Sequence, residues 1–308
     1  MPRLIDDMRA HGAKIAMPWF VAREHEDEWV EISKHVHDGI MRPDLPVLLI
    51  DNVADYYYSS EQEYWNLREH FPNLAPPYPM FWAEHRMPRQ IHSKECGDTD
   101  MSALVPNGRQ GVLVTAVRRQ DVEGVDIPEA TKWLLWCELF MDYNFRKDIT
   151  AHGPHGSMFF CIDKEGALLH DPQMRSLADE ADQELMQHHF TQLHPTLLAI
   201  SFLHCKNVTV VRNEVDKPLA RKYERNHGVK PVSYHTLVIE PLKQVLRREG
   251  RSHVVGIQQA MHICRGHFKD YREGRGLFGK YHQLVWMPQL VRGTRGGIPP
   301  AREIKIKV

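Results

Sequence analysis

The residues best suited to chemistry form one segment near the end of the chain, His262–Tyr271. If this segment is an extended strand, its side chains alternate between two faces. One face is then cationic and titratable, and it carries Arg265, His267, Lys269 and Tyr271. Because an imidazole moves protons near neutral pH and Arg and Lys hold phosphates, such a face suits a metal-independent ribonuclease. We therefore treat His267, His262 and Tyr271 as candidate catalytic residues; the alternative is an edge strand with a solvated basic face.

Two glycine-rich basic loops follow, Arg272–Lys280 and Val291–Gly297. Glycines let backbone amides approach an anion closely, and arginines supply forked donors. The candidate phosphate ligands in this region of the chain are Arg265, Lys269, Arg272, Arg275, Lys280, Arg292 and Arg295. The chain has no GxxxxGK[ST], and its GxGxxG at Gly274–Gly279 is followed by an expected strand and not by a helix, which argues against a nucleotide-hydrolysing or dinucleotide-binding protein. As an alternative, both loops are ordinary hairpin connections.

Charge is sorted along the chain, although the net charge is only −1. Residues 217–308 hold 19 Lys and Arg against 6 Asp and Glu, a net charge of +13, whereas residues 1–216 hold 20 against 34, a net charge of −14. Clustered cations bind phosphates by releasing condensed counterions, so one interpretation is an RNA or DNA partner. The other is that the acidic and basic regions fold against each other and their charges cancel.

The sequence predicts no metal and no cofactor. Its 20 histidines include His188-His189 and His152-Gly-Pro-His155, but no HExxH and no Cys/His quartet at zinc spacing. The five cysteines form no CxxC pair, which fits a reducing compartment. No apolar run reaches roughly 18 residues. We therefore expect a cytoplasmic protein with no membrane segment.

The elements that position these residues are predicted from apolar spacing and turn residues. A first helix is expected at Trp19–Val36 and ends by Gly39, and a second begins at the capping pattern Ser60/Glu63. Further helices are expected at Ser176–Phe190 and Pro195–Cys205, with a basic helix or arm at Lys217–Asn226. Strands are expected at Leu45–Ile50, Met80–His85, Gly111–Arg118, Trp133–Met141, Ser157–Ile162 and Ala167–His170, with a hairpin turn at Asp163–Gly166. Further strands are expected at Tyr234–Ile239, Ala260–Tyr271, Tyr281–Met287 and Glu303–Val308.

This order predicts an α+β fold with a largely antiparallel sheet flanked by helices. We expect one domain over residues 1–308. The alternative is a division into an acidic segment, residues 1–215, and a basic, β-rich segment, residues 216–308.

Four patterns recur together over the last ninety or so residues: Lys222–Leu237, the Arg-Gly-His strand His262–Phe268, Trp286-Met287-Pro288 and Val291-Arg292-Gly293. In these patterns the chain resembles a group of uncharacterised bacteriophage and prophage proteins. The resemblance implies a phage-encoded accessory protein in the cytoplasm of a bacterial host, and it brings no established activity.

Three hypotheses remain open. The first is an accessory protein that binds nucleic acid or another phosphate-bearing ligand through a basic C-terminal surface. The second is a metal-independent endoribonuclease or toxin-like enzyme. The third is a protein that binds and inhibits a host factor, or that associates with itself.

Overall fold

A computed structural model describes thirteen stretches of the chain. They are residues 3–12, 26–59, 70–86, 108–122, 127–141, 156–169, 173–175, 183–239, 262–264, 266–274, 276, 282–287 and 290–292.

The centre of the molecule is an eight-stranded mixed sheet with strand order β6-β5-β4-β3-β2-β1-β8-β7. Its strands are β1 (Val47–Leu49), β2 (Met80–Arg86), β3 (Arg109–Arg118), β4 (Trp133–Met141), β5 (Gly156–Ile162), β6 (Gln173–Arg175), β7 (Val208–Asn213) and β8 (Tyr234–Ile239). β1 runs parallel to both of its neighbours, β2 and β8, and every other pairing is antiparallel. The fold is thus α+β with a largely antiparallel sheet, as the sequence predicts.

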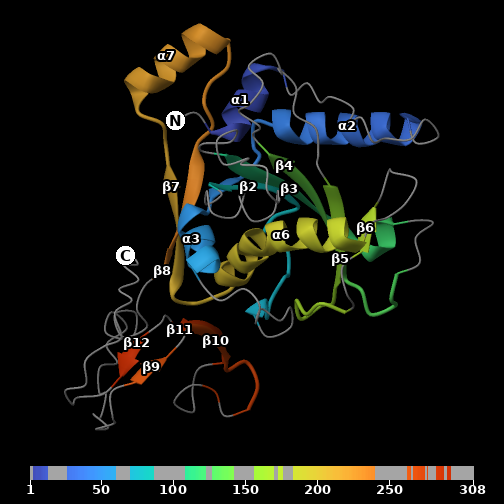
Figure 1. Cartoon of the computed structure of the whole chain (residues 1–308), viewed down its shortest axis with the longest axis vertical. Helices are drawn as coiled ribbons and strands as arrows, with labels where there is room; N and C mark the ends of the chain where they lie inside the picture. Colours follow the sequence, from blue (N-terminus) through green and yellow to red (C-terminus); the bar gives the residue numbers. More distant parts are fainter. Residues whose placement is uncertain are drawn as a thin grey trace.

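Helices cover both faces of this sheet (Figure 1). α1 (Leu4–Ala10) and α2 (Glu26–Met41) pack on one face, against Val47, Trp82 and Leu113. α3 (Asp51–Ser59) and α6 (Gln183–Leu203) pack on the other. Because both faces are covered, the central strands read as almost continuous apolar runs.

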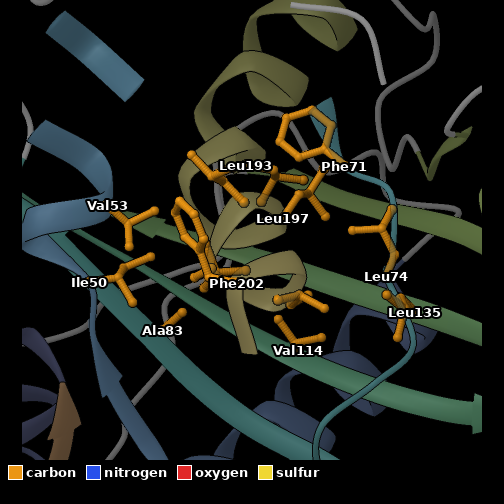
Figure 2. Packing of buried hydrophobic residues seen from close by; sticks show 14 of the residues in the cluster. Ile50, Val53, Phe71, Leu74, Ala83, Val114, Leu135, Leu193, Leu197 and Phe202 are labelled. Atoms are coloured by element: carbon orange, nitrogen blue, oxygen red, sulfur yellow. The ribbon is translucent and has the colours of Figure 1, made fainter. Parts of the chain in front are cut away.

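The larger core lies between α3, α6 and the sheet (Figure 2). Strand alternation divides the two cores: Phe81 and Ala83 of β2 point toward α6, whereas Trp82 between them packs under α1 and α2. Gly111 of β3 makes room for Trp82, since a Cβ on that glycine would lie 2.0 Å from the indole ring.

α6 corrects one expectation. The sequence predicts two helices, Ser176–Phe190 and Pro195–Cys205, but the structure has one helix that continues through Pro195. Leu193, Leu197 and Ile200 are buried at helical spacing on both sides of the proline. Tertiary packing of this face therefore outweighs the tendency of proline to end a helix.

The turn Asp163–Gly166 is confirmed. Gly166 has φ +91°, and Asp163 Oδ1 accepts the amides of Glu165 and Ala167 at 2.9 and 2.8 Å. The strand expected after it reduces to one bridge, between Ile162 and Leu168.

Further elements depart from the sequence prediction. α1, α3, β6 and β7 are not predicted, nor are the short elements Arg119–Asp121 and Leu290–Arg292, and α2 continues past Gly39 to Met41. Residues 13–25, the helix expected after Ser60 and the strand Glu303–Val308 lie outside the described residues.

The remaining elements are a short 3₁₀ helix, η4 (Arg119–Asp121), α7 (Lys217–His227) and four short strands. The strands are β9 (His262–Cys264), β10 (His267–Asp270), β11 (Leu284–Met287) and β12 (Leu290–Arg292). They form two separate two-stranded sheets, β10 with β11 and β12 with β9. In the sequence, α7 lies between β7 and β8, and these two strands are paired in the main sheet. Residue 215 therefore falls within the connection between two neighbouring strands of one sheet.

Of the helices described, none has the length and apolar character needed to span a membrane.

Candidate functional site

The predicted catalytic strand is two strands, which is a correction. The sequence predicts one strand over Ala260–Tyr271, but β9 and β10 belong to different sheets. Gly266 lies between them, where a Cβ would come within 2.8 Å of the Trp286 ring and 2.9 Å of the Tyr56 hydroxyl. Because β9 and β10 belong to different sheets, the alternation argued for residues 262–271 does not hold across its whole length.

This break separates the two candidate histidines. His262 lies in β9 with its Cα paired to that of Arg292 in β12. His267 begins β10, is exposed, and is paired with Met287 of β11. Tyr271 follows β10, and its backbone N–H donates to the Gln283 carbonyl at 3.0 Å. The backbone of His262 is therefore paired with that of Arg292, and His267 belongs to a different sheet.

Among the proposed phosphate ligands, Lys269 is half-buried in β10, in register with Val285. Arg272 is held by Asp270, with its Nη2 2.6 Å from Oδ2, and the pKa of Arg272 is raised mainly by this hydrogen bond. A second nitrogen, Nη1, donates to the Glu165 carbonyl at 3.3 Å. These contacts leave Arg272 few donors for an added phosphate. The candidates that fall outside the described residues are Arg265, Arg275, Lys280 and Arg295.

β10 and β11 are fixed to the main core by aromatic contacts. Phe268 and Trp286 lie 4.7 Å apart between ring centroids, and both contact Phe202 of α6, at 5.3 and 4.8 Å. Asn207 adds two buried hydrogen bonds to the backbone of Trp286, at 2.9 and 3.0 Å. The small sheet that carries His267 and Lys269 thus sits on the end of α6.

A different segment presents the clearest cationic surface. α7 begins with Pro218 in its first turn, where the missing N–H costs nothing, and ends at Gly228 with φ +73°. The Gly228 amide donates to the Glu224 carbonyl at 2.8 Å, which closes the last turn. Proline at the start and glycine at the end therefore fix the limits of this helix in the sequence.

One face of α7 holds the helix to the rest of the protein. The Tyr223 hydroxyl donates to the Asp6 carbonyl at 2.7 Å, and the Tyr223 ring stacks on His227 at 4.4 Å. Just beyond the helix, the Val232 amide donates to Asp6 Oδ1 at 2.8 Å. The N-terminal helix α1 therefore anchors both α7 and the chain that follows it.

The opposite face of α7 is basic, and we call it the cationic face. It carries Lys217, Arg221, Lys222 and Arg225, all exposed. Spacings of four and eight residues place Lys217, Arg221 and Arg225 in one row, and at about 100° per residue Lys222 lies beside them, away from Tyr223. Within the described residues none of these four side chains forms an ion pair. No residue of α7 is buried, and Figure 1 shows the helix at one end of the molecule, beyond β7.

The sequence predicts a basic helix or arm here but does not single out its cations as ligands. The signal that could have found them is the four-residue spacing of Lys217, Arg221 and Arg225. Residues 262–271 hold more titratable and cationic side chains close together in the sequence. A comparison of residue types alone therefore selects that segment before the spaced cations of α7.

Metal chemistry finds no support in the region of the chain that is described, where no group of three or more His, Cys, Asp or Glu side chains is arranged to hold an ion. Comparisons with protein-family models, with curated proteins and with solved structures find no match to this chain.

Proposed function

We propose that the protein binds nucleic acid through the cationic face of α7. The observation that carries this proposal is a row of exposed Lys and Arg side chains, without acidic partners among the described residues, on a helix anchored by its other face. Because these cations are not engaged, they can replace condensed counterions on a phosphate backbone without first breaking ion pairs.

The dimensions of the helix suit this role. Eight residues separate Lys217 from Arg225, a rise of about 12 Å. A DNA duplex carries one charge per roughly 1.7 Å of its axis, so a stretch of duplex of this length carries about seven phosphate charges on its two strands. Lys and Arg at such spacing read charge rather than base sequence, which predicts binding with little sequence preference.

An anionic membrane is the less favoured partner for the same helix. Interfacial helices bury a broad apolar face, but on α7 Leu219 is the exposed large apolar side chain and Tyr223 is tied to Asp6. Vesicles of phosphatidylserine therefore belong in the test as a comparison.

The test is fluorescence anisotropy with labelled duplex DNA, single-stranded DNA and single-stranded RNA, in chelator, from about 50 to 200 mM salt. For four cations we expect affinity to fall on the order of 100-fold across this range. A variant in which Lys217, Arg221, Lys222 and Arg225 are all changed to Gln should lose most of this binding and most of its salt dependence.

The matched control removes four exposed charges elsewhere, by changing Lys34, Arg119, Lys132 and Lys164 to Gln. It should bind nearly as well as the unchanged protein. The proposal fails if the unchanged protein does not bind at low salt, if both variants lose affinity equally, or if vesicles bind and nucleic acids do not.

A metal-independent ribonuclease activity is the second candidate, and one observation favours it. His267 is exposed on β10, and Lys269 lies two residues along the same strand on the same face. The RNA recovered from the binding experiment, made in chelator, is therefore examined for cleavage. Cleavage that is lost in His267→Ala and kept in the α7 variant would assign activity to β10.

A further inference from the structure

A pocket of about 260 Å³ lies away from the histidine-containing strands, between α2 and strands β3 and β4. Its walls are apolar at Ile32 and Val117, and the indole of Trp136 forms one side. Trp136 is held in place by stacking on Phe159, with ring centroids 5.9 Å apart and planes at 20°. The volume is just below the roughly 300–1,000 Å³ typical of small-molecule sites, so a ligand about the size of one ring fits it.

Glu138 lines this pocket with only 1% of its surface exposed. Its carboxyl group accepts hydrogen bonds from the Trp136 indole N–H and the Ser157 hydroxyl, both of which are uncharged donors. Among the described residues no Lys or Arg lines the pocket, and no cation lies beside this carboxylate. A buried carboxylate without a counterion is costly, and burial raises the pKa of Glu138 to about 7, against the lowering effect of its two hydrogen bonds.

The groups that face Glu138 do not supply the missing charge. α2 presents Glu31, a second acidic group, and His35, whose pKa is lowered mainly by burial, with Asp38 opposing. His35 is therefore mainly neutral at pH 7, and its Nε2 lies 3.1 Å from the Thr115 hydroxyl. β3 and β5 contribute Thr115 and Ser157, which do not titrate in this range.

We propose that this pocket binds a small organic cation, an amine or amidinium on an apolar body, with its charge against Glu138 and its body between Trp136, Ile32 and Val117. The cation supplies the counterion that Glu138 lacks, and the face of the indole attracts the same positive charge. Glu31 adds attraction from α2, whereas an anionic ligand would meet two carboxyl groups. The proposal is independent of α7 and of nucleic-acid binding.

The charge of Glu138 makes binding depend on pH. A cation prefers the ionised carboxylate, so its binding releases the proton that the buried acid holds below a pH of about 7. Since the ionised fraction rises about tenfold from pH 6 to pH 8, affinity should rise by about the same factor. A neutral ligand in the same pocket would show no such rise.

The test uses benzamidine and its neutral relative benzamide, with binding measured by calorimetry at pH 6 and pH 8. We expect benzamidine to bind at least tenfold more tightly than benzamide at pH 8, and to lose about tenfold in affinity at pH 6. In Glu138→Gln this preference and the pH dependence should both disappear. The matched control, Glu129→Gln, changes an exposed acidic residue outside the pocket and should leave both unchanged.

A second variant keeps the test decisive if Glu138→Gln does not fold. Val117 is only half-buried, and Val117→Phe fills the pocket while Glu138 is left intact. It should abolish benzamidine binding. Equal binding of benzamidine and benzamide, no binding of either compound to the unchanged protein, or full binding by Val117→Phe would overturn the proposal.

Discussion

Glu84 ties the N-terminal helix α1 to the sheet. It is fully buried on β2, and its two oxygens accept the amides of Leu4 and Ile5 at 2.8 and 3.1 Å. The Trp82 indole N–H and the Arg109 guanidinium donate to the same carboxylate. The first amides of α1, which have no partner within their own helix, are thus capped from the sheet.

Glu84→Gln should destabilise the protein by about 3 kcal/mol or more, because it leaves the charge of buried Arg109 without its main partner. Urea unfolding measures this loss. Glu129→Gln, on the surface, should change the free energy of unfolding by less than about 0.5 kcal/mol. A loss for Glu84→Gln as small as that of the control would show that buried Arg109 does not depend on this carboxylate.

At the residue scale the sequence shows which side chains could do chemistry but not what surrounds them. Glu138 sits in WLLWCELFM, which reads simply as a buried strand. Its pocket exists because α2 crosses β3 and β4, a packing that no local pattern encodes. The same limit applies to Arg272, whose attachment to Asp270 and Glu165 is visible only in the fold.

At the scale of elements, Asn207 is one polar link between the main core and the small sheet of β10 and β11. Its side chain both donates to and accepts from the backbone of Trp286. Asn207→Ala removes both bonds and leaves two buried backbone groups without these partners, at a cost of about 2–3 kcal/mol.

Hydrogen exchange should therefore speed up in β10 and β11 of Asn207→Ala and stay slow in β3 and β4. Asn213→Ala provides the control, since this asparagine on β7 bonds to Val211 and Thr236 and not to β11. Equal acceleration across the whole sheet would show that Asn207 stabilises the molecule in general and not this junction.

Elements with strong local signals are the ones that sequence predicts. β4 and β8 occupy the expected ranges, because each is an apolar or β-branched run between turn residues. α3 is missed, because a helix of Asp51–Ser59 with three tyrosines gives little apolar periodicity. Its buried Val53 and Tyr57 become meaningful only once α6 packs beside them.

At the scale of the whole molecule, two buried histidines make the protein sensitive to acid. The pKa of His85 and that of His194 are each lowered to about 3, mainly by burial and further by Arg109 and His70 respectively. Below the ordinary histidine pKa of 6.5, these histidines bind protons in the unfolded chain but stay neutral in the folded protein. The free energy of unfolding therefore falls as the pH decreases from about 6.5 toward 3.

Glu138 acts in the opposite direction, because a raised carboxyl pKa favours the folded state at lower pH, over roughly pH 4.5 to 7. Its shift is smaller than that of either histidine, so the two histidines outweigh Glu138. The urea midpoint should fall steadily from pH 6.5 to pH 4, and the slope should flatten in a variant with both His85→Asn and His194→Asn. An unchanged slope would place the acid sensitivity elsewhere.

The acidic and basic regions of the sequence are only partly separated in the folded molecule. The basic region begins with α7, which the structure presents at one end, but the following strand β8 enters the main sheet. The fold class and the basic character of residues 217–227 are predictable from composition and spacing. Parallel pairing between β1 and β8 is not, because it joins segments that share no local pattern.

That pairing has a consequence for synthesis. β1 is flanked by β2 on one side and by β8 on the other, and Asn52 beside β1 bonds to Leu237 across 185 residues. At about 5–20 residues per second, a ribosome needs roughly 10–40 s to supply the second neighbour. During that interval β1 is an open edge that another nascent chain can join. A chain that ends before Tyr234 would therefore leave this edge open and aggregate, even when strands β2 to β6 are paired.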